Sequence, residues 1–340
     1  MPTIIITAAD TLFFGTGRPF TMGEDSWTKG MFPPNPETLY GFLRGCYFLD
    51  HNGELDKANT PSDPTKDLRV INYGLLKLED NAISRLFAWP LDLVINHDKK
   101  SFVLPLVYQP TPILTNCALQ TGWKLMETSD EKLRKPKGMN FLTETDFQNY
   151  LMSKYDELIR LKLSDLIVSE PKIGIFRNRF DSNEKELYRL QMNRLETKTH
   201  QVSLWIEFDG LKLPNSLINR LGGEGKLVFV NETDQTNNNV PIIAAENDII
   251  RMYLNSPALL GKGWLPEIDG AQLLAATIGN PMYISGFDIK SKWPKPTVKA
   301  VPSGSVYYFK ILTTNCSLPT KIGNGTKKGF GTVTYSKITI

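Results

Sequence analysis

The stretch Asn35-Pro-Glu-Thr-Leu-Tyr-Gly-Phe-Leu-Arg-Gly-Cys-Tyr-Phe-Leu49 carries the signals of the first helix of this chain. Asn35 is a favoured N-cap residue, and Pro36 suits the first helical position, where a backbone N–H is not needed. We expect the helix to end near Gly53 and to bury one apolar face. The residues of that face are Leu39, Phe42, Leu43, Cys46 and Leu49.

An apolar strand and a long loop precede this helix. Thr3 to Ala9 is predicted to be a buried strand, and residues 10–34 contain several glycines together with Arg18 and Lys29. A dinucleotide-binding fold needs a tight glycine turn between its first strand and helix. Because the loop is long, the sequence argues against that fold.

Two later segments predict a long hairpin. Apolar and basic residues interleave from Lys172 to Phe180 and again from Leu187 to Glu196. Arg177 and Arg179 share one face of the first arm. An arm rich in arginine and aromatic residues suits full burial poorly, so we expect the hairpin to project and bind a partner. The alternative is a hairpin that lies on its own domain while its arginines reach solvent. One face of the second arm carries Tyr188, Leu190, Met192 and Arg194.

The length of the chain and a local change in its residue composition predict two domains. The chain has 340 residues, which exceeds the roughly 100–200 residues of a typical domain, and its 41% hydrophobic residues supply a core. Residues 210–225 are rich in glycine and include Leu221-Gly-Gly-Glu-Gly225, after which a new strand is predicted from Lys226 to Val230. We therefore place the domains at residues 1–210 and 211–340.

The remaining elements predict an α+β protein. The second half combines strands with a helix expected at Ala271 to Ile278. Two runs rich in polar residues, 51–68 and 128–145, are expected to be surface insertions. Strands are expected at 202–208, 251–254, 283–289, 305–312 and 332–340.

Charge is distributed unevenly along the chain. Residues 290–340 contain nine lysines and no acidic residue, so with a net charge of +3 the other residues carry 3 − 9 = −6. Near the end of this stretch lies Gly323-Asn-Gly-Thr-Lys-Lys-Gly-Phe-Gly331. Lysines and open backbone amides suit phosphate oxygens, which makes nucleic acid the first candidate ligand. The alternative is a solvated lysine face on which the glycines only turn the chain.

Reactive groups are few. The three histidines (51, 97 and 200) and three cysteines (46, 117 and 316) have neither metal-ligand nor disulfide spacing. We expect no metal, no cofactor, no membrane segment and a cytoplasmic location. One enzymatic possibility is metal-free RNA cleavage with His51 as general acid or base. The alternative is a solvated histidine beside Asp50 at the helix end.

Several motifs together resemble a known family. They are Gly17-Arg-Pro-Phe20, the run from Phe32 to Arg44, Leu221 to Gly225, Ala300-Val-Pro-Ser-Gly-Ser-Val-Tyr-Tyr-Phe309 and Gly329-Phe-Gly331. Their order and content resemble the Cmr3-type subunits of type III-B CRISPR effector (Cmr) complexes, within the RAMP superfamily.

The resemblance implies two tandem ferredoxin-like (RRM-like) domains, with the hairpin at about residues 171–200 as a protruding thumb. It also implies a subunit that is not an enzyme and that holds the 5′ handle of the crRNA. The expected protein partners are the large polymerase/cyclase subunit and an adjacent RAMP backbone subunit.

By motif position, the resemblance also implies which residues contact RNA or shape its groove. The terminal loop has lysines and no arginine, which favours point-charge contacts with phosphates over bidentate reading of bases. Two alternatives stay open: a metal-independent CRISPR repeat-processing endoribonuclease that uses His51, and a protein-interaction scaffold whose lysine-rich end meets an acidic partner. The implied RNA-contact residues are Arg18, Asn35, Arg44, Lys172, Arg177, Arg179, Met192, Arg194, Gly222, Gly223, Gly225, Gly325, Lys327, Lys328, Gly329, Phe330 and Gly331.

Overall fold

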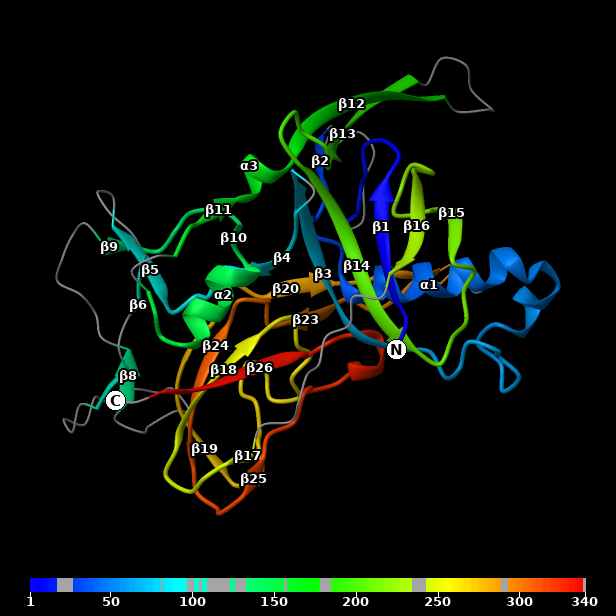
Figure 1. Cartoon of the computed structure of the whole chain (residues 1–340). Coiled ribbons are helices and arrows are strands. Elements are labelled where there is room, and N and C mark those ends of the chain that lie inside the picture. The colour runs from blue at the N-terminus through cyan, green and yellow to red at the C-terminus, as the bar shows by residue number, and fades with distance from the viewer. Residues whose placement is uncertain are drawn as a thin grey trace. The chain divides into compact units, whose positions relative to one another are not determined.

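The computed structural model (Figure 1) describes residues 1–16, 27–80, 82–96, 101–103, 106–108, 123–125, 133–155, 158–177, 185–233, 243–288 and 293–338. The chain divides into two compact units, each assembled from separated segments. Unit 1 comprises Met1–Ile83, Ser164–Thr236 and Tyr283–Val298, and unit 2 comprises Ser84–Leu163, Asn237–Met282 and Lys299–Ile340. Both units take residues from either side of position 210, and the division into 1–210 and 211–340 stays a prediction.

Unit 1 is built on an antiparallel sheet. The strand predicted at the N-terminus is confirmed as β1, where it lies between two neighbours and buries Ile4 and Ile6. The strands predicted at 202–208 and 226–230 are its neighbours. In the described residues of this unit the order is β3 (Arg69–Glu79), β14 (Gln201–Asp209), β1 (Thr3–Ala8), β16 (Leu227–Thr233) and β15 (Ser216–Arg220).

The first helix is α1 (Pro36–Asp50), and it begins as predicted. The side-chain oxygen of Asn35 accepts a hydrogen bond from the Thr38 amide at 3.0 Å. The predicted apolar face is buried up to Cys46, but Leu49 is 50% exposed and Phe48 is buried instead. Phe48 lies one turn after Arg44, whose guanidinium carbon is 5.9 Å from the Phe48 ring centroid. The Arg44 side chain therefore lies against Phe48 in the last turn of the helix.

The predicted hairpin is confirmed in unit 1. Strand β12 (Val168–Arg177) pairs antiparallel with β13 (Lys185–Arg194), and β2 (Trp27–Lys29) runs parallel to β13. The far end of the hairpin extends away from the β1–β16 sheet in Figure 1. Its base is packed down, because Leu190 and Met192 form a buried cluster with Phe13.

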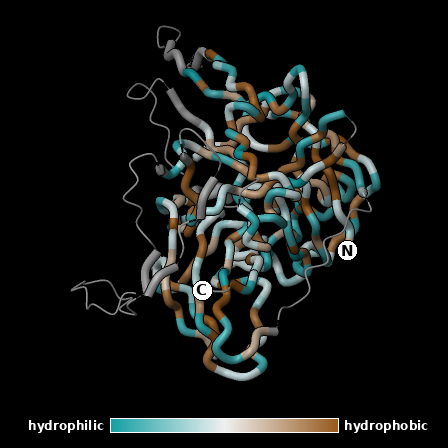
Figure 2. Tube along the Cα trace, turned by 60° about the vertical axis from the view of Figure 1, so that its left-hand side comes forward, coloured by the Kyte–Doolittle hydropathy of each residue, from teal (hydrophilic) through white to brown (hydrophobic). Residues whose placement is uncertain are grey.

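Unit 2 contains a second antiparallel sheet, buried on both faces. In its central strands, Met252, Tyr307 and Phe309 belong to one core cluster, whereas Tyr253 and Tyr308 belong to another. Successive side chains of a strand point to opposite faces, so the sheet has a core cluster on each face. Figure 2 shows how short hydrophobic and hydrophilic stretches follow one another along the chain. The sheet order is β19 (Ala271–Thr277), β24 (Val306–Ile311), β18 (Ile249–Leu254) and β26 (Val333–Ile338).

The helix predicted at Ala271 to Ile278 is wrong, because this segment is strand β19. It pairs with β24 in a register that shifts between Leu273 and Ala275. A short apolar run fits a buried strand as well as a helical face, and periodicity alone does not separate the two. The preceding Gly270 has a φ of 74°, which turns the chain into the strand.

The run at 128–145 is not wholly an insertion. Its described end forms β10 (Asn140–Thr143), which pairs with β4 (Ala82–Ala88) and β11 (Leu161–Lys162) and buries Phe141 and Leu142. The helix α2 (Glu144–Leu151) follows directly, capped by the Thr143 hydroxyl.

Shorter elements complete the described chain. No helix in the described residues is both long and apolar enough to cross a membrane. The shorter helices and strands of the described chain are η1 (Asn52–Lys57), β5 (Leu93–Asn96), β6 (Ser101–Val103), β7 (Leu106–Tyr108), β8 (Trp123–Leu125), β9 (Leu133–Arg134), α3 (Leu163–Leu166), β17 (Ile243–Ala244), β20 (Met282–Ile284), β21 (Phe287–Asp288), β22 (Trp293–Pro294), β23 (Val298–Ala300), β25 (Cys316–Ser317) and η2 (Thr326–Lys328).

Candidate nucleic-acid interface

Part of the predicted interface lies outside the described residues. Arg18 and Arg179 fall beyond them, and Arg177 is placed only as the last backbone position of β12. Their predicted contacts stay predictions. The other predicted residues fall into three groups: the first helix, the hairpin base with the Leu221–Gly225 segment, and the terminal loop.

Arg44 is bound within its own chain. Its Nη2 lies 2.7 Å from Asp63 Oδ2, its Nε donates to Thr65 Oγ1 at 2.8 Å, and its Nη1 donates to Asn59 Oδ1 at 3.0 Å. Burial raises the pKa of Asp63, but hydrogen bonds from Thr65 and Asn59 and the Arg44 charge outweigh it and hold that pKa below its usual range. Residues 51–68, predicted to be a surface insertion, are thus docked onto α1, with Thr65 and Leu68 buried.

Asn35 has a structural task in the same region. It is buried, and its side-chain oxygen accepts from both the amide and the hydroxyl of Thr38. An N-cap oxygen so engaged fixes where α1 begins. This part of the predicted interface therefore organises the fold of the helix and the segment after it.

At the hairpin base, cations and carboxylates alternate. Arg194 Nη2 lies 3.0 Å from Glu170 Oε2 and 3.1 Å from Asp10 Oδ1, and Lys226 Nζ lies 2.8 Å from Asp10 Oδ2. The Lys226 hydrogen bond is the main cause that lowers the pKa of Asp10, and the Arg194 hydrogen bond is the main cause for Glu170. The structure thus brings together two basic residues and two carboxylates that stay ionised.

The Leu221–Gly225 segment joins this cluster. Lys172 Nζ contacts Glu224 Oε2 at 2.5 Å, and the Gly223 amide donates to the Phe13 carbonyl at 2.8 Å. Gly222 has a φ of 77°, and a Cβ there would lie 2.3 Å from the Phe13 oxygen. Glycine is required at this close approach. We call Asp10, Glu170, Lys172, Arg194, Glu224 and Lys226 the hairpin-base cluster.

Met192 is not placed to insert between bases. It is 2% exposed and packs against Phe13 and Leu190. These side chains anchor the base of the hairpin, and its projection beyond the base stays a prediction. The exposed side chain of Ile173 shows that the opposite face of the first arm reaches solvent.

The terminal glycine loop is more closed than predicted. The amides of Asn324, Lys328 and Gly329 donate to carbonyl oxygens of the chain, as does the amide of Gly331. The expectation of open backbone N–H groups is therefore wrong for these four positions. A Cβ at Gly331 would lie 1.9 Å from the Ile322 oxygen, so only glycine fits there.

The side chains of this loop separate into two kinds. Phe330 is 1% exposed and packs against Gly325, so it is part of the core and does not offer a ring for stacking. Lys327 is exposed and Lys328 is half-buried, both at the end of η2. The loop presents these basic side chains on a backbone that is hydrogen-bonded within the chain.

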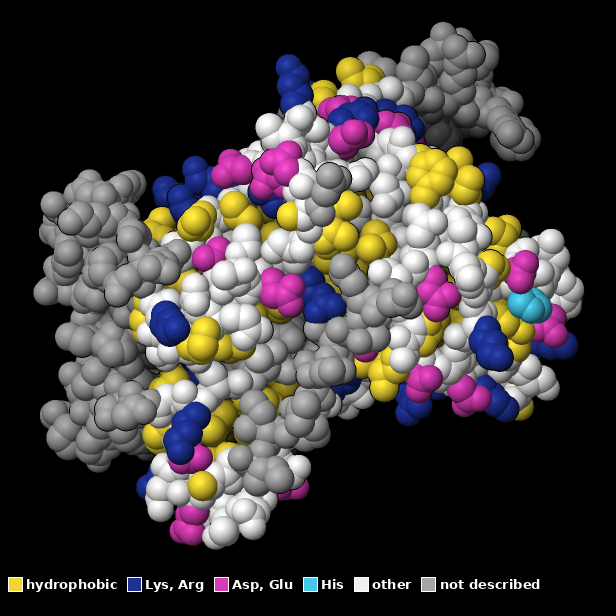
Figure 3. All heavy atoms as spheres, in the orientation of Figure 1, with side chains coloured by type: hydrophobic (Ala, Val, Ile, Leu, Met, Phe, Trp, Pro, Cys, Tyr) yellow, Lys and Arg dark blue, Asp and Glu magenta, His cyan; other side chains and the backbone are white. Residues whose placement is uncertain are grey.

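The lysine-rich stretch 290–340 contributes lysines to both units, and acidic residues pair with some of them. Lys295 lies 3.4 Å from Glu37, and Lys337 lies 2.6 Å from Asp248, so acidic residues from elsewhere meet them. On the face seen in Figure 3, basic and acidic side chains are likewise interspersed.

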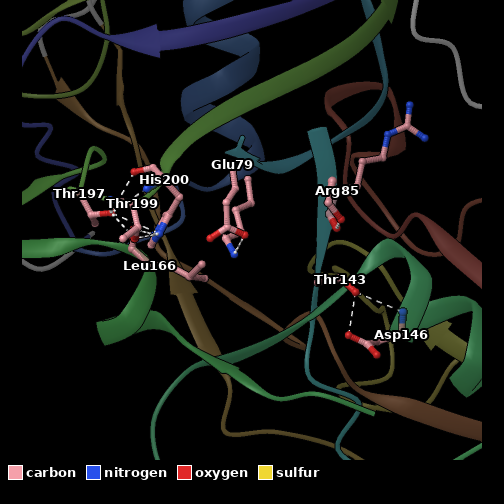
Figure 4. Close-up of polar contacts among 10 residues, drawn as sticks. Glu79, Arg85, Thr143, Asp146, Leu166, Thr197, Thr199 and His200 are labelled. Carbon is pink, nitrogen blue, oxygen red and sulfur yellow. Dashed lines mark hydrogen bonds and ion pairs between the residues drawn. The ribbon is translucent and has the colours of Figure 1, made fainter. Parts of the chain in front are cut away.

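The described histidines have structural contacts. His51 Nδ1 donates to the Tyr47 carbonyl at 3.0 Å, and its ring stacks on Tyr47 with centroids 4.1 Å apart. In Figure 4, His200 Nε2 donates to the Leu166 carbonyl at 3.1 Å, which leaves Nδ1 to accept from Thr199. His97 lies outside the described residues. Among the residues that the structure describes, no group of three or more His, Cys, Asp or Glu residues is arranged to hold a metal.

Sequence reasoning missed the carboxylates of the cluster. Asp10 and Lys226 are 216 positions apart, and Arg194 and Asp10 are 184 apart. Glu170 and Arg194 are only 24 positions apart, because both lie in the hairpin. Glu170 pairs with Met192 in the strand register and so lies diagonal to Arg194. Cross-strand pairing of opposite charges in the predicted hairpin was the one local signal available.

Comparisons with known proteins agree with the resemblance. The family model described as CRISPR-associated protein (Cas_Cmr3) matches residues 4–336. A chain of a cryo-EM structure of the Type III-B Cmr-beta bound to cognate target RNA and AMPPnP, state 1, is similar with a TM-score of 0.53 and 17% identity, covering 90% of this chain and 86% of that chain.

A chain of the cryo-EM structure of the Type III-B Cmr-beta bound to cognate target RNA has the same TM-score of 0.53, 18% identity and coverage of 90% of this chain and 86% of that chain. At this identity the likeness concerns the fold alone. No curated protein matches the chain.

Proposed function

The chain belongs to the CRISPR-associated Cas_Cmr3 family, and from this premise we propose that it is a non-catalytic RNA-binding subunit of a type III-B (Cmr) effector complex. In this function it holds the 5′ handle of the crRNA and docks onto the large polymerase/cyclase subunit and an adjacent RAMP backbone subunit. The observation that carries the proposal is the family match over residues 4–336, which includes the hairpin and both glycine segments.

The fold gives this proposal a physical basis. Each unit has an antiparallel sheet and at least one helix, α1 in unit 1 and α2 in unit 2. The proposed arrangement as two tandem ferredoxin-like domains is compatible with these elements. Sheets of this kind bind single-stranded RNA through basic side chains and stacked aromatic rings.

The hairpin-base cluster supports the proposal electrostatically. Asp10 bridges Arg194 and Lys226, Glu170 pairs with Arg194, and Glu224 pairs with Lys172. A backbone phosphate carries one negative charge, as a carboxylate does, and both accept paired hydrogen bonds from arginine. An RNA backbone that replaces these carboxylates would find its cations already positioned.

Crosslinking in the assembled particle tests the proposal. The full chain is reconstituted with its partner subunits and a crRNA that carries 4-thiouridine in the handle, and crosslinked peptides are mapped after irradiation. We expect crosslinks within residues 168–194, 221–225 or 323–331. Crosslinks found only on other subunits would reject handle binding by this chain, whichever partners it docks onto.

Salt dependence gives a second measurement. If four to six cations contact phosphates, the single-strand slope of about −0.7 per contact predicts an affinity that falls roughly several-hundred-fold or more for a tenfold rise in salt. Titrations of the isolated chain with handle RNA at two salt concentrations measure this slope. A flat response contradicts phosphate contacts.

A further inference from the structure

Trp293 stands out among the side chains that the fold leaves in solvent. Its exposed fraction of 74% is the highest of the large hydrophobic side chains among the described residues. It lies on β22, which pairs with β21 so that Trp293 is opposite Asp288 in the strand register. Tryptophan has the largest apolar area to bury, and its contacts dominate many interfaces.

The backbone around Trp293 is held in place. The Lys295 amide donates to the Gly286 carbonyl at 2.8 Å, and the Ser285 hydroxyl donates to the Lys295 carbonyl at 2.9 Å. The Lys295 ammonium also lies 3.4 Å from Glu37 in the first turn of α1. The indole therefore projects from a strand whose adjoining backbone at Lys295 is hydrogen-bonded within unit 1, so little order would have to be gained when a ligand stacks on it.

Charge decides which ligand suits this indole. The unit 1 segment Tyr283–Val298 contains three lysines and one aspartate, a net charge of 3 − 1 = +2, and the Glu37 carboxylate beside Lys295 reduces this to 2 − 1 = +1. Lys295 follows the tryptophan by two positions, and its side chain is 42% exposed. A planar apolar ring two positions before a lysine matches a ligand that offers a flat base next to a phosphate, which is the pattern of single-stranded nucleic acid.

We propose that Trp293 is a stacking platform for one base of a single-stranded nucleic acid, and that Lys295 neutralises the phosphate beside that base. The proposal deepens the RNA-binding function above and rests on it. Stacking on an indole is tolerant of base identity, since every base has a flat face. Trp293 therefore contributes affinity and position, and sequence reading falls to other residues.

The test uses the full chain and a fluorescein-labelled oligouridylate of eight nucleotides, with binding followed by anisotropy. We expect Trp293→Ala to weaken binding about 5-fold to 150-fold, the range that corresponds to one stacked base. Trp293→Phe keeps a ring and should retain most of the affinity. Leu55→Ala is the matched control, because Leu55 is 59% exposed on η1 and carries no ring. Since both side chains are exposed, the thermal midpoint should stay unchanged in all variants.

The phosphate contact has its own measurement. Lys295→Ala should make the salt slope of oligouridylate binding shallower by about 0.7, the value of one phosphate contact on a single strand. Heparin, a polyanion without bases, should bind the wild type and Trp293→Ala equally. Equal loss of heparin and oligouridylate in Trp293→Ala would show a general change of the surface and overturn the stacking role.

The remaining outcomes separate this proposal from the function it rests on. If the wild-type chain crosslinks to the crRNA handle and Trp293→Ala binds oligouridylate normally, the stacking platform is overturned and handle binding stands. If Trp293→Ala weakens assembly with the partner subunits and leaves RNA binding intact, the indole is a protein contact and the proposal is again overturned. If the wild type binds no RNA at all, both are overturned.

Discussion

Arg194 holds the carboxylate of Glu170 through two nitrogens, with Nε 2.5 Å from Oε1 and Nη2 3.0 Å from Oε2. The same Nη2 lies 3.1 Å from Asp10. Because both carboxyl groups have pKa values below their usual range, they stay ionised at neutral pH. A basic side chain proposed to bind phosphate is thus already occupied by anions of its own chain, and RNA has to compete with them.

Glu170→Gln should strengthen RNA binding. The substitution keeps the side-chain shape and removes a negative charge beside Arg194, so we expect the affinity for handle RNA to rise roughly 2-fold to 10-fold at low salt and less at high salt. Anisotropy titrations at two salt concentrations measure the change. Glu267→Gln is the control, because Glu267 pairs with Lys262 and belongs to unit 2, whereas the cluster belongs to unit 1. Weaker binding by Glu170→Gln would mean that the carboxylate orients Arg194 for RNA.

Local sequence signals predicted the elements whose causes are local. The cap formed by Asn35 and Pro36 placed the start of α1, and interleaved apolar and basic residues placed β12 and β13. Segment 271–277 was mistaken for a helix, because its choice of structure depends on pairing with β24. That partner is distant in sequence, and the apolar pattern does not contain it.

In the candidate site, too, features with local causes were predicted from the sequence, and features that depend on distant residues were not. Glycine positions such as Gly222 and Gly331 were found from their motifs, and each meets a backbone oxygen that excludes a Cβ. The ion pairs of Arg44 and Arg194 were not found, because a basic residue in a motif has the same letter whether it faces a phosphate or a carboxylate. Trp293 was missed because an aromatic residue near strands is more often part of the core.

Arg44→Ala should reduce stability as well as any RNA contact. It removes three hydrogen bonds and leaves the buried Asp63 without its cation, so we expect a loss of about 1–3 kcal/mol in the free energy of unfolding. Urea unfolding measures this loss. Arg220→Ala, an exposed residue on β15, is the comparison and should stay within about 0.5 kcal/mol of wild type. A stable Arg44→Ala protein with weak RNA binding would assign Arg44 to the RNA interface.

His51→Ala should leave RNA processing unchanged. The ring is bound to the Tyr47 carbonyl and stacked on the Tyr47 ring at the end of α1, which explains its position without catalysis. We expect repeat RNA incubated in EDTA to give no discrete product with either the purified wild type or the purified His51→Ala variant. A product that requires His51 would support the endoribonuclease alternative.

Arg251→Met should be among the most destabilising substitutions in unit 2. Arg251 is 1% exposed, donates to the carbonyls of Tyr150 and Leu151 at the end of α2, and lies 3.9 Å from the Tyr150 ring centroid. Its loss leaves these buried carbonyl oxygens without their donor and removes the charge that favours the ionised form of Asp92, so we expect about 3–5 kcal/mol of lost stability.

Urea unfolding of Arg251→Met and Arg69→Met checks this expectation. Arg69 forms an exposed pair with Asp209 at 2.7 Å, and such pairs contribute below about 1 kcal/mol. Equal losses for the two variants would show that the buried network is replaceable by an apolar side chain.

Asp92 predicts a dependence of stability on pH. Burial is the main cause that raises its pKa, and the Arg251 charge and the hydrogen bonds from Tyr308 and Tyr150 oppose it. The folded protein therefore keeps the proton at pH values where the unfolded chain, with a pKa near 3.8, has lost it. This stabilisation is complete below the unfolded pKa and is lost as pH rises through the folded value. We expect the free energy of unfolding of the wild type to fall relative to Asp92→Asn as the pH rises above about 4, the unfolded pKa.

Asp209→Asn is the control with the opposite sign. Hydrogen bonds from the Gly210 amide and then from Arg69 lower the pKa of Asp209, so its contribution is present above the unfolded pKa and is lost as pH falls. Relative to Asp209→Asn, the wild type should therefore gain stability as pH rises from below about 4. Chemical unfolding at several pH values measures both differences. If the Asp92 difference does not change with pH, this carboxyl group ionises equally in the folded and unfolded chain, and the surrounding tyrosines and Arg251 fully offset its burial.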